Sequence, residues 1–136
     1  MQYDHFIGQV QHRARLASRG EAESATRATL ETLGERIPEG LVDNVAGQLP
    51  TEAAVHLRRT ITMNGSGTGE RFDRDEFVAR VASRGEIPEP RAAYQARVVL
   101  EVFREATQGG VVNKIREALP EDVRTLVDAG SSGSLD

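Results

Sequence analysis

Hydrophobic residues recur along this chain at intervals of three and four positions, the period that places side chains on one face of an α-helix. Phe6 and Val10 predict a first helix over residues 3–13. A longer helix is predicted over residues 19–36, because six apolar or small residues there share one face: Ala22, Thr26, Thr29, Leu30, Leu33 and Ile37. The first third of the chain is therefore expected to be helical.

Turn-forming residues divide the next segment into two shorter helices. Pro38 and Gly40 end the long helix, and a third helix follows with an apolar face made of Leu41, Val42, Val45 and Leu49. Pro50 ends that helix, because the residue before a proline is disfavoured in the α-conformation. Proline is tolerated in the first turn of a helix, so a fourth helix is predicted over residues 51–58.

The second half of the chain repeats the first. A shift of 71 residues aligns DHFIGQV (4–10) with DEFVARV (75–81), and a shift of 70 aligns residues 28–50 with 98–120. The second alignment holds seven identities: Leu30, Glu31, Glu35, Gly40, Val42, Leu49 and Pro50 match Leu100, Glu101, Glu105, Gly110, Val112, Leu119 and Pro120. Two such blocks in the same order indicate that a four-helix unit has been duplicated.

These patterns predict one all-α domain over residues 1–128, with about eight helices in two pseudo-symmetric four-helix repeats. Repeat 1 spans residues 3–59 and repeat 2 spans residues 72–128. A Gly-rich linker, residues 60–71, is expected to join them, and residues 129–136 are expected to form a flexible tail.

Several motifs in this pattern also resemble a known protein family. They are an acidic start followed by Phe (YDHF, DRDEF), the helix ATLETLGERI with the corner QLP, and their repeats RVVLEVFREA and ALP. Together they resemble the bacterial and archaeal domain-of-unknown-function family numbered 2267, over residues 3–128. The resemblance implies an all-helical fold and supplies no catalytic residues.

Composition and charge exclude several classes of function. The chain has no cysteine, which excludes disulfides, thiolate catalysis and thiolate metal sites. Its net charge of −4 and the absence of a basic stripe argue against nucleic-acid binding. No apolar run approaches 18 residues, so no membrane-spanning helix is expected. The N-terminal MQYDHFIGQV lacks the basic and apolar regions of a signal peptide, which favours a cytoplasmic protein.

The three histidines do not predict a metal site. His5 and His12 are seven residues apart on one helix face, and His56 could approach them from the fourth helix. The second repeat, however, has Glu76 in place of His5 and Leu126 in place of His56. Histidines at or near the surface are therefore the favoured interpretation, and no metal ligand is predicted.

The glycines and the carboxylates do not indicate a cofactor site or a catalytic site either. The glycines of NGSGTGE, residues 64–70, lack the spacing of a dinucleotide-binding loop, so no cofactor is predicted. The acidic pairs lie at predicted helix starts, where carboxylates satisfy backbone N–H groups. Ser18 with Glu21 and Asp73 with Glu76 have the spacing of such caps. No catalytic residue is therefore predicted.

The arginines offer the one weak candidate site. Arg13, Arg15 and Arg19 cluster around the first turn between helices and could bind an anion. Two binding functions follow. The favoured one is a scaffold module that holds a protein partner in a groove between the repeats. The alternative is a small-molecule or anion-binding regulatory domain that uses these arginines. An enzyme is less favoured than either binding function, and nucleic-acid binding ranks below all three. The sequence leaves open whether the protein forms a homodimer.

Overall fold

The computed structural model describes residues 1–62 and 69–131, and within them the chain is all-α, with eight helices and no strand. The helices are α1 (Tyr3–Arg13), α2 (Arg19–Arg36), α3 (Glu39–Ala46), α4 (Thr51–Thr62), α5 (Arg74–Gly85), α6 (Glu89–Ala106), α7 (Val111–Ala118) and α8 (Glu121–Ala129). The predicted all-helical fold is confirmed. None of these helices is long and apolar enough to cross a bilayer.

Local sequence accounts for where several helices begin. The Ser18 hydroxyl accepts the backbone N–H of Glu21, and the Glu21 carboxylate accepts the N–H of Ser18, so the predicted capping box is present at α2. The Asp73 carboxylate caps α5 by accepting the N–H of Glu76 at 2.9 Å. A proline with extended backbone directly precedes α3, α6 and α8. The capping side chains and the prolines thus mark helix starts that can be recognised in the sequence.

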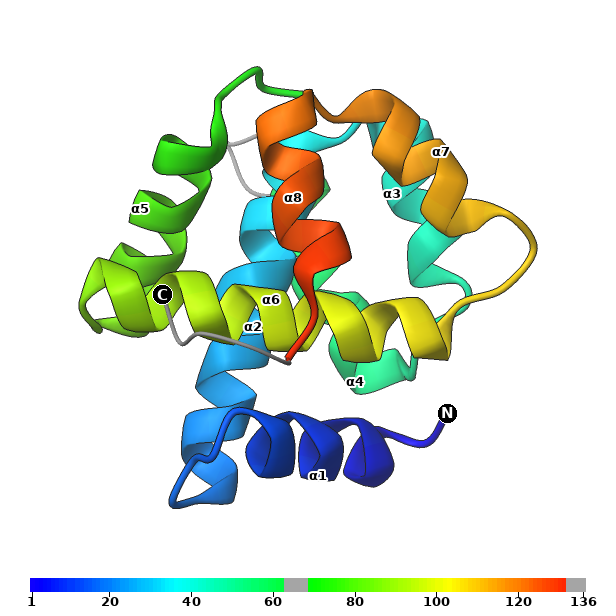
Figure 1. Ribbon diagram of the computed structural model, residues 1–136. Helices are drawn as coiled ribbons and strands as arrows, with labels where there is room; N and C mark the ends of the chain where they lie inside the picture. Colours follow the sequence, from blue (N-terminus) through cyan, green and yellow to red (C-terminus); the bar gives the residue numbers. More distant parts are fainter. Residues whose placement is uncertain (63–68, 132–136) are drawn as a thin grey trace.

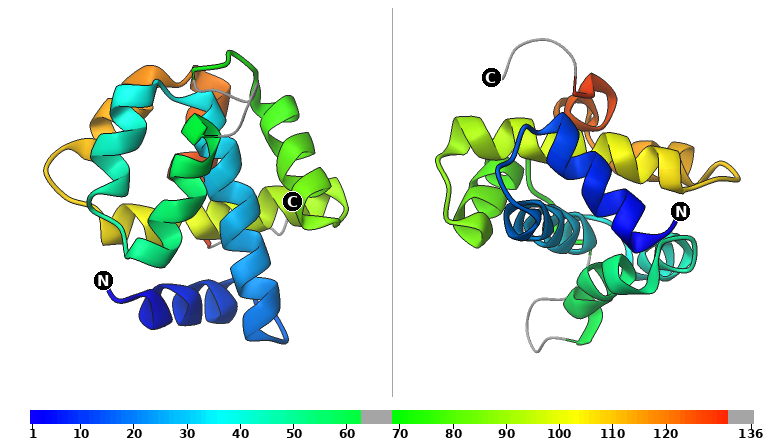
Figure 2. Two further views of the ribbon diagram at one scale, coloured as in Figure 1. Left: turned by 180° about the vertical axis from the view of Figure 1, so that it is seen from behind. Right: turned by 90° about the horizontal axis from the view of Figure 1, so that it is seen from below.

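The two long helices, α2 and α6, cross at the centre of the molecule (Figures 1 and 2). Helix α2 packs against α1, α4, α5 and α6, and helix α6 packs against α1, α2, α5 and α8. The first helix of each half therefore touches the long helix of the other half. Because neighbours surround α2, even its polar residues Glu31, Glu35 and Arg36 are buried.

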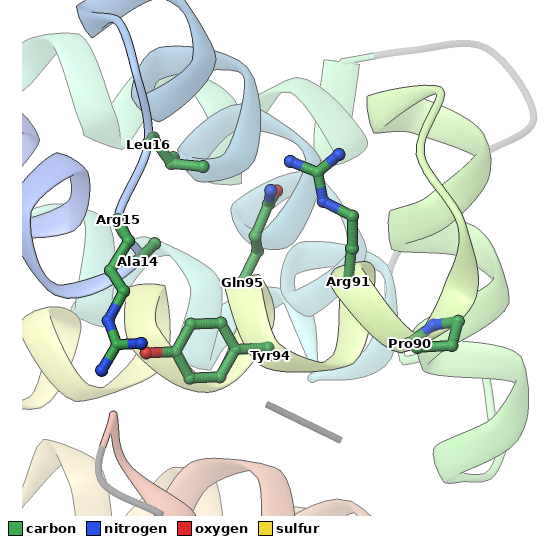
Figure 3. A pocket seen from close by; sticks show the side chains of 7 residues that line it. All are labelled: Ala14, Arg15, Leu16, Pro90, Arg91, Tyr94 and Gln95. Atoms are coloured by element: carbon green, nitrogen blue, oxygen red, sulfur yellow. The ribbon is translucent and has the colours of Figure 1, made fainter. Parts of the chain in front are cut away.

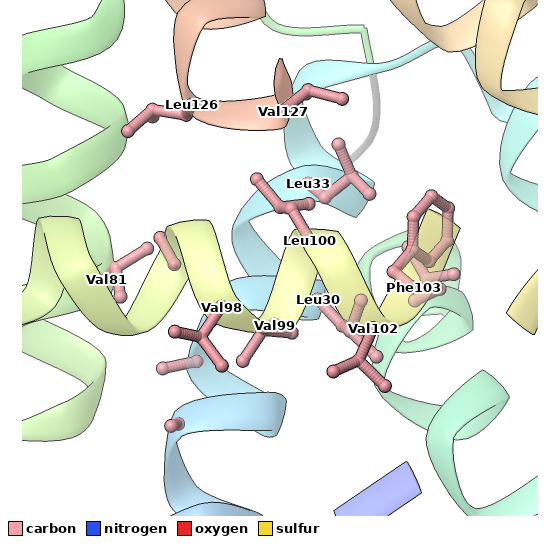
Figure 4. Packing of buried hydrophobic residues seen from close by; sticks show 14 of the residues in the cluster. Leu30, Leu33, Val81, Val98, Val99, Leu100, Val102, Phe103, Leu126 and Val127 are labelled. Carbon is pink, nitrogen blue, oxygen red and sulfur yellow. The ribbon is translucent and has the colours of Figure 1, made fainter. Parts of the chain in front are cut away.

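One hydrophobic core fills the space between these helices. Figure 4 shows Leu30 and Leu33 of α2 facing Leu100 and Phe103 of α6, with side chains of α8 above them. The two matched phenylalanines, Phe6 and Phe77, are both fully buried in the same core. Burial of this aliphatic surface is the main stabilising contribution in a chain with so few aromatic residues.

Helix α4 is longer than its sequence pattern predicts, because it packs closely against α2. It continues to Thr62, although the prediction ends it at residue 58. At the contact, a Cβ added to Gly34 would lie 2.8 Å from the Leu57 carbonyl oxygen and from Thr60 Oγ1. The absence of a side chain at Gly34 lets the two helices approach. Residues 60–62 of the predicted linker are thus helical, while residues 63–68 lie outside the described part of the chain.

Arg84 of α5 binds three polar side chains of α2, a group that we call the Arg84 cluster. Its Nη1 donates to Thr32 Oγ1 and to Glu35 Oε1, both at 2.8 Å, and its Nε lies 3.4 Å from Glu31 Oε1. Burial by itself would raise the pKa of Glu35, but hydrogen bonds and charge from Arg84 and Arg80 hold that pKa below its ordinary value. The cluster therefore keeps a buried carboxylate ionised.

Arg13 of α1 binds α6 in a similar manner, in what we call the Arg13 cluster. Its Nη1 donates to Glu101 Oε1 at 2.8 Å and to Glu105 Oε2 at 2.7 Å, while Nη2 donates to Glu105 Oε1 at 2.8 Å. The hydrogen bond from Arg13 is the main reason why the pKa of Glu105 lies below its usual value. Two charged clusters thus join the first helix of one half to the long helix of the other.

Candidate functional site beside the first turn

A pocket of about 260 Å³ opens between the α1–α2 connection and the first turns of α6. Seven residues line it: Ala14, Arg15, Leu16, Pro90, Arg91, Tyr94 and Gln95 (Figure 3). Three of them are aliphatic and one is aromatic, so the wall is largely apolar. The polar groups are the two guanidinium groups, the Gln95 amide and the Tyr94 hydroxyl.

The end of α1 determines how Arg15 and Leu16 reach this pocket. Arg15 has a left-handed backbone, with a φ of +57°, and its N–H donates to the His12 carbonyl oxygen at 3.3 Å. The Leu16 N–H then donates to the Gln11 carbonyl oxygen at 3.0 Å, which closes the turn. The chain therefore reverses sharply, with Arg15 exposed and Leu16 partly buried against the core.

Tyr94 contributes its ring to the pocket, because its hydroxyl is already engaged. The side chain is buried, and its hydroxyl donates to the Arg13 carbonyl oxygen at 2.8 Å, with the Ser131 carbonyl oxygen at 3.3 Å. The Cζ of Arg97 lies 5.5 Å from the ring centroid. These contacts fix the ring and leave it as an apolar surface for whatever enters.

Gln95 is the unusual member of the lining. It is only 7% exposed, yet its amide makes no hydrogen bond within the described part of the chain. Figure 3 shows the amide between Leu16 and Arg91, facing the pocket. Its amide nitrogen and oxygen are not among the fully buried atoms that lack a partner in the described residues, so they are open to the pocket. A ligand in the pocket could satisfy this amide, since it offers both a donor and an acceptor.

The two arginines of the pocket differ from most arginines of the protein. Among the described residues, neither Arg15 nor Arg91 forms an ion pair or a side-chain hydrogen bond. Both are exposed at the pocket rim, on either side of the buried Gln95. Among the described residues, neither guanidinium group is therefore paired with a carboxylate.

Replacing Arg15 with glycine should stabilise the unliganded protein by about 0.5–1 kcal/mol, because glycine adopts a left-handed backbone without steric cost. The exposed arginine side chain contributes no packing that would offset this gain. Glu86 ends α5 with a φ of +54°, so Glu86→Gly is the matched variant and should give a similar gain. Urea unfolding followed by circular dichroism would measure both. Destabilisation by Arg15→Gly alone would mean that its side chain already supports the fold.

The three arginines singled out in the sequence occupy different environments. Arg13 binds two carboxylates in the Arg13 cluster. Arg19 donates to Asp4 Oδ1 at 2.8 Å, and its Cζ lies 5.7 Å from the Tyr3 ring centroid. Of the three, Arg15 lines the pocket. The structure thus brings Arg15 together with Arg91 of α6.

Sequence reasoning missed Arg91, Tyr94 and Gln95. A signal for Gln95 was present, because it shares the apolar face of α6 with Ala92, three residues before it, and Val99, four residues after it. A lone amide on such a face indicates either a buried hydrogen bond or a ligand contact. Arg91 gave no comparable signal, because exposed arginines are common in this chain.

The histidines lie apart from this pocket. His5 and His12 are exposed on α1, and His56 is partly buried on α4 with no hydrogen-bond partner for its Nδ1. Burial, and then the charge of Arg59, lower the pKa of His56. Within residues 1–62 and 69–131, no group of three or more His, Asp or Glu side chains is arranged to hold a metal ion.

Residues 3–126 match the model of the family described as "Uncharacterized conserved protein (DUF2267)". The chain belongs to this family. The resemblance inferred from the motifs is thereby confirmed over nearly the same range. No curated protein matches the chain. The matched range contains α1 to α7, the first two-thirds of α8 and every residue of the pocket.

Proposed function

We propose that this protein binds a small organic anion in the pocket formed by Arg15, Arg91, Tyr94 and Gln95. The observation that carries the proposal is the pocket itself, in which the Gln95 amide, with no hydrogen bond to the described residues, lies between two arginines that form no ion pair there. This function is the alternative predicted from the sequence. Arg15 stays in the proposed site, but Arg91, Tyr94 and Gln95 take the place of Arg13 and Arg19.

The lining favours a ligand with a charged end and a compact apolar body. Arg15 and Arg91 can each pair with a carboxylate or phosphate oxygen through two N–H groups. Leu16, Pro90 and the ring of Tyr94 would cover the apolar part. A pocket of about 260 Å³ is at the small end for ligand sites, so the ligand is a small metabolite rather than a nucleotide.

The same lining supports binding rather than catalysis. A reaction needs a nucleophile, a general acid or a general base within reach of the ligand. The residues that line this pocket include no histidine and no carboxylate, and the Tyr94 hydroxyl is engaged by backbone carbonyl groups. The function that fits is recognition of an anion, with the bound ligand stabilising the turn between α1 and α2.

Benzoate and benzamide test the proposal, because they share size and shape and differ in charge. In NMR titrations, benzoate should shift the amide signals of Arg15, Leu16 and Gln95 with a dissociation constant on the order of 1 mM. Benzamide should bind at least about tenfold more weakly, the ratio that loss of one charge-assisted contact gives. Equal binding of the two probes, or shifts confined to other surfaces, would refute an anion pocket.

Three variants assign the binding to particular side chains. Arg91→Gln should weaken benzoate binding by about tenfold or more, while Arg58→Gln, an exposed arginine of α4, should leave it unchanged. Gln95→Leu keeps the size of the side chain and removes the unpartnered amide. It should weaken benzoate binding, because the ligand loses a hydrogen-bond partner. Unchanged binding in both Arg91→Gln and Gln95→Leu would contradict the proposal.

The protein-binding groove predicted from the sequence stays a separate proposal, and it has less support. Such a groove needs a contiguous exposed apolar surface. In the described part of the chain, the large hydrophobic residues that are exposed are Met1, at 42%, and Val55, at 48%. A protein partner captured equally by the native chain and by Arg91→Gln, together with no binding of benzoate, would favour the groove.

We also propose that the domain consists of two pseudo-symmetric repeats that exchange their first helices. Arg13 and Arg84 are 71 residues apart, and each binds a pair of glutamates in the other half. The glutamates, Glu31 with Glu35 and Glu101 with Glu105, are themselves 70 residues apart. The left-handed turn at Arg15 recurs at Glu86, again 71 residues on. Equivalent contacts at equivalent spacings support a duplicated unit.

The duplication also explains why the anion pocket is present in one copy. A smaller hollow of about 90 Å³, lined in part by Glu21, Ser24 and Ile87, lies at the corresponding turn of repeat 2. By the 70-residue shift, Glu21 replaces Arg91 and Ser24 replaces Tyr94, and Glu86 replaces Arg15 by the 71-residue shift. Arg91 and Gln95 also border this second hollow, but the carboxylate of Glu21 lines it beside Arg91 and no aromatic ring does. The second hollow thus lacks the pair of arginines and the ring that make the first an anion site.

A further inference from the structure

A second pocket, of about 480 Å³, lies at the opposite end of α2 from the anion pocket. It opens where the last residue of α2, the segment before α5 and the α7–α8 corner meet, at the upper end of the molecule in Figure 1. Its lining includes Arg36, Pro38, Arg71, Glu117, Leu119 and Pro120. No residue of this lining belongs to the pocket around Gln95.

Arg36 is the most deeply buried charge of this second pocket. It is only 8% exposed, and its Nε donates to the Phe72 carbonyl oxygen at 2.9 Å. Its Cζ lies 5.8 Å from the centroid of the Phe72 ring. Its two terminal nitrogens form no hydrogen bond with the described residues, and no carboxylate there forms an ion pair with it. These nitrogens are not among the fully buried atoms that lack a partner in the described residues, so they are open to the pocket and can donate to a ligand there.

The surroundings of Arg36 add positive charge. Burial lowers the pKa of Arg36, and the neighbouring charge of Arg71 lowers it further, while Asp122 acts in the opposite direction. Arg71 is exposed and has no ion pair in the described part of the chain. The Asp122 carboxylate is already occupied, because it accepts the backbone N–H of Arg74 at 2.9 Å.

The carboxylate of Glu117 also lines the pocket and must be considered. Glu117 is exposed on α7 and forms no ion pair with either arginine among the described residues. Glu117 therefore does not neutralise the guanidinium group of Arg36. An anion that enters beside Arg36 would supply what neither Glu117 nor Asp122 provides.

We propose that this pocket binds a phosphate group, held between the guanidinium groups of Arg36 and Arg71. A phosphate carries up to two negative charges and offers several acceptor oxygens, which suits two neighbouring guanidinium groups better than a single carboxylate does. The buried Arg36 gives the site a fixed donor, and the exposed Arg71 can close over the bound group. The site is independent of the anion pocket at the other end of α2.

Inorganic phosphate is the probe for this site. An NMR titration at constant ionic strength, balanced with chloride, should give a saturable shift of the Arg36 Nε–Hε signal and of the Phe72 and Leu119 amides. Arg71→Gln should weaken phosphate binding at least about tenfold, and because Arg71 is exposed this variant is expected to fold. Arg36→Gln should abolish the saturable shift if the variant folds.

Arg91→Gln separates the two proposals. It should leave phosphate binding at the Arg36 site unchanged, even though it weakens benzoate binding at the other pocket. A linear shift with no saturation, an equal response to chloride, or unchanged phosphate binding in Arg71→Gln would overturn the phosphate site. None of these results would affect the proposal for the anion pocket.

Discussion

Truncating Leu119 to alanine is expected to destabilise the protein by about 3 kcal/mol, and truncating Leu49 by about 2–3 kcal/mol. Leu119 is 2% exposed and Leu49 is 8% exposed, so both variants remove buried methyl groups and leave a cavity. Each leucine precedes a proline and follows the last turn of a short helix, with its N–H donating to a carbonyl oxygen at 3.2 Å. The backbone of each corner is therefore fixed and cannot collapse easily into the space left.

Urea unfolding at equilibrium would measure both losses of stability. Val55→Ala is the control, since Val55 is 48% exposed on α4 and its truncation should change the free energy of unfolding by less than about 0.5 kcal/mol. Comparable losses for Leu49→Ala and Leu119→Ala would support equivalent corners in the two halves. A nearly neutral result for either leucine would contradict the packing of that corner.

Replacing Arg84 with methionine is expected to cost about 2–3 kcal/mol, and replacing Arg13 about 1 kcal/mol. Methionine keeps most of the aliphatic length and removes the charge. The glutamate side chains bound by Arg84 are each 9% exposed, whereas Glu101 and Glu105, bound by Arg13, are 19% and 47% exposed. Removing the cation costs more stability when the carboxylates that it binds are less exposed to water. Arg80 and Arg59 stay beside the buried pair and limit the loss at Arg84.

The pH dependence of this difference distinguishes charge from packing. The pKa of Glu35 is lower in the folded protein than the ordinary glutamate value of 4.5. Its ion pairs therefore contribute their full stability at pH values above 4.5. This contribution is lost as the pH falls through the lower pKa of the folded state. The gap in stability between the native chain and Arg84→Met should narrow under acid conditions. A gap that is independent of pH would mean that Arg84 acts through packing alone.

The helices themselves could be predicted from local spacing. The bounds predicted for α1 and α2 match the structure, since caps and apolar periodicity involve residues three or four positions apart. The apolar residues of α2, however, predict that only one face of this helix is buried. Glu31, Thr32 and Glu35 are buried as well, because α5 covers the side of α2 that looks polar in sequence. Amphipathic spacing identifies such a helix, but it cannot show that charged partners cover the polar face.

The candidate site shows the same limit. Arg13, Arg15 and Arg19 look alike in sequence, but their partners lie at very different distances along the chain. Arg13 meets carboxylates 88 and 92 residues away, and Arg19 meets one 15 residues away. Arg15 reaches the pocket because its own backbone is left-handed. Which of the three keeps an unpaired charge therefore depends on how α6 packs against α1.

The sequence by itself determined the all-helical fold, the helix starts at Ser18 and Asp73, and the family, because these features depend on short-range spacing and on motifs. Only the tertiary structure decided that α1 and α5 each pack on the long helix of the other half, which charges are neutralised, and that Gln95 is buried beside two free guanidinium groups. The physical reason is that charge pairing and pocket formation depend on residues brought together from distant parts of the chain. Periodicity within one helix carries no information about them.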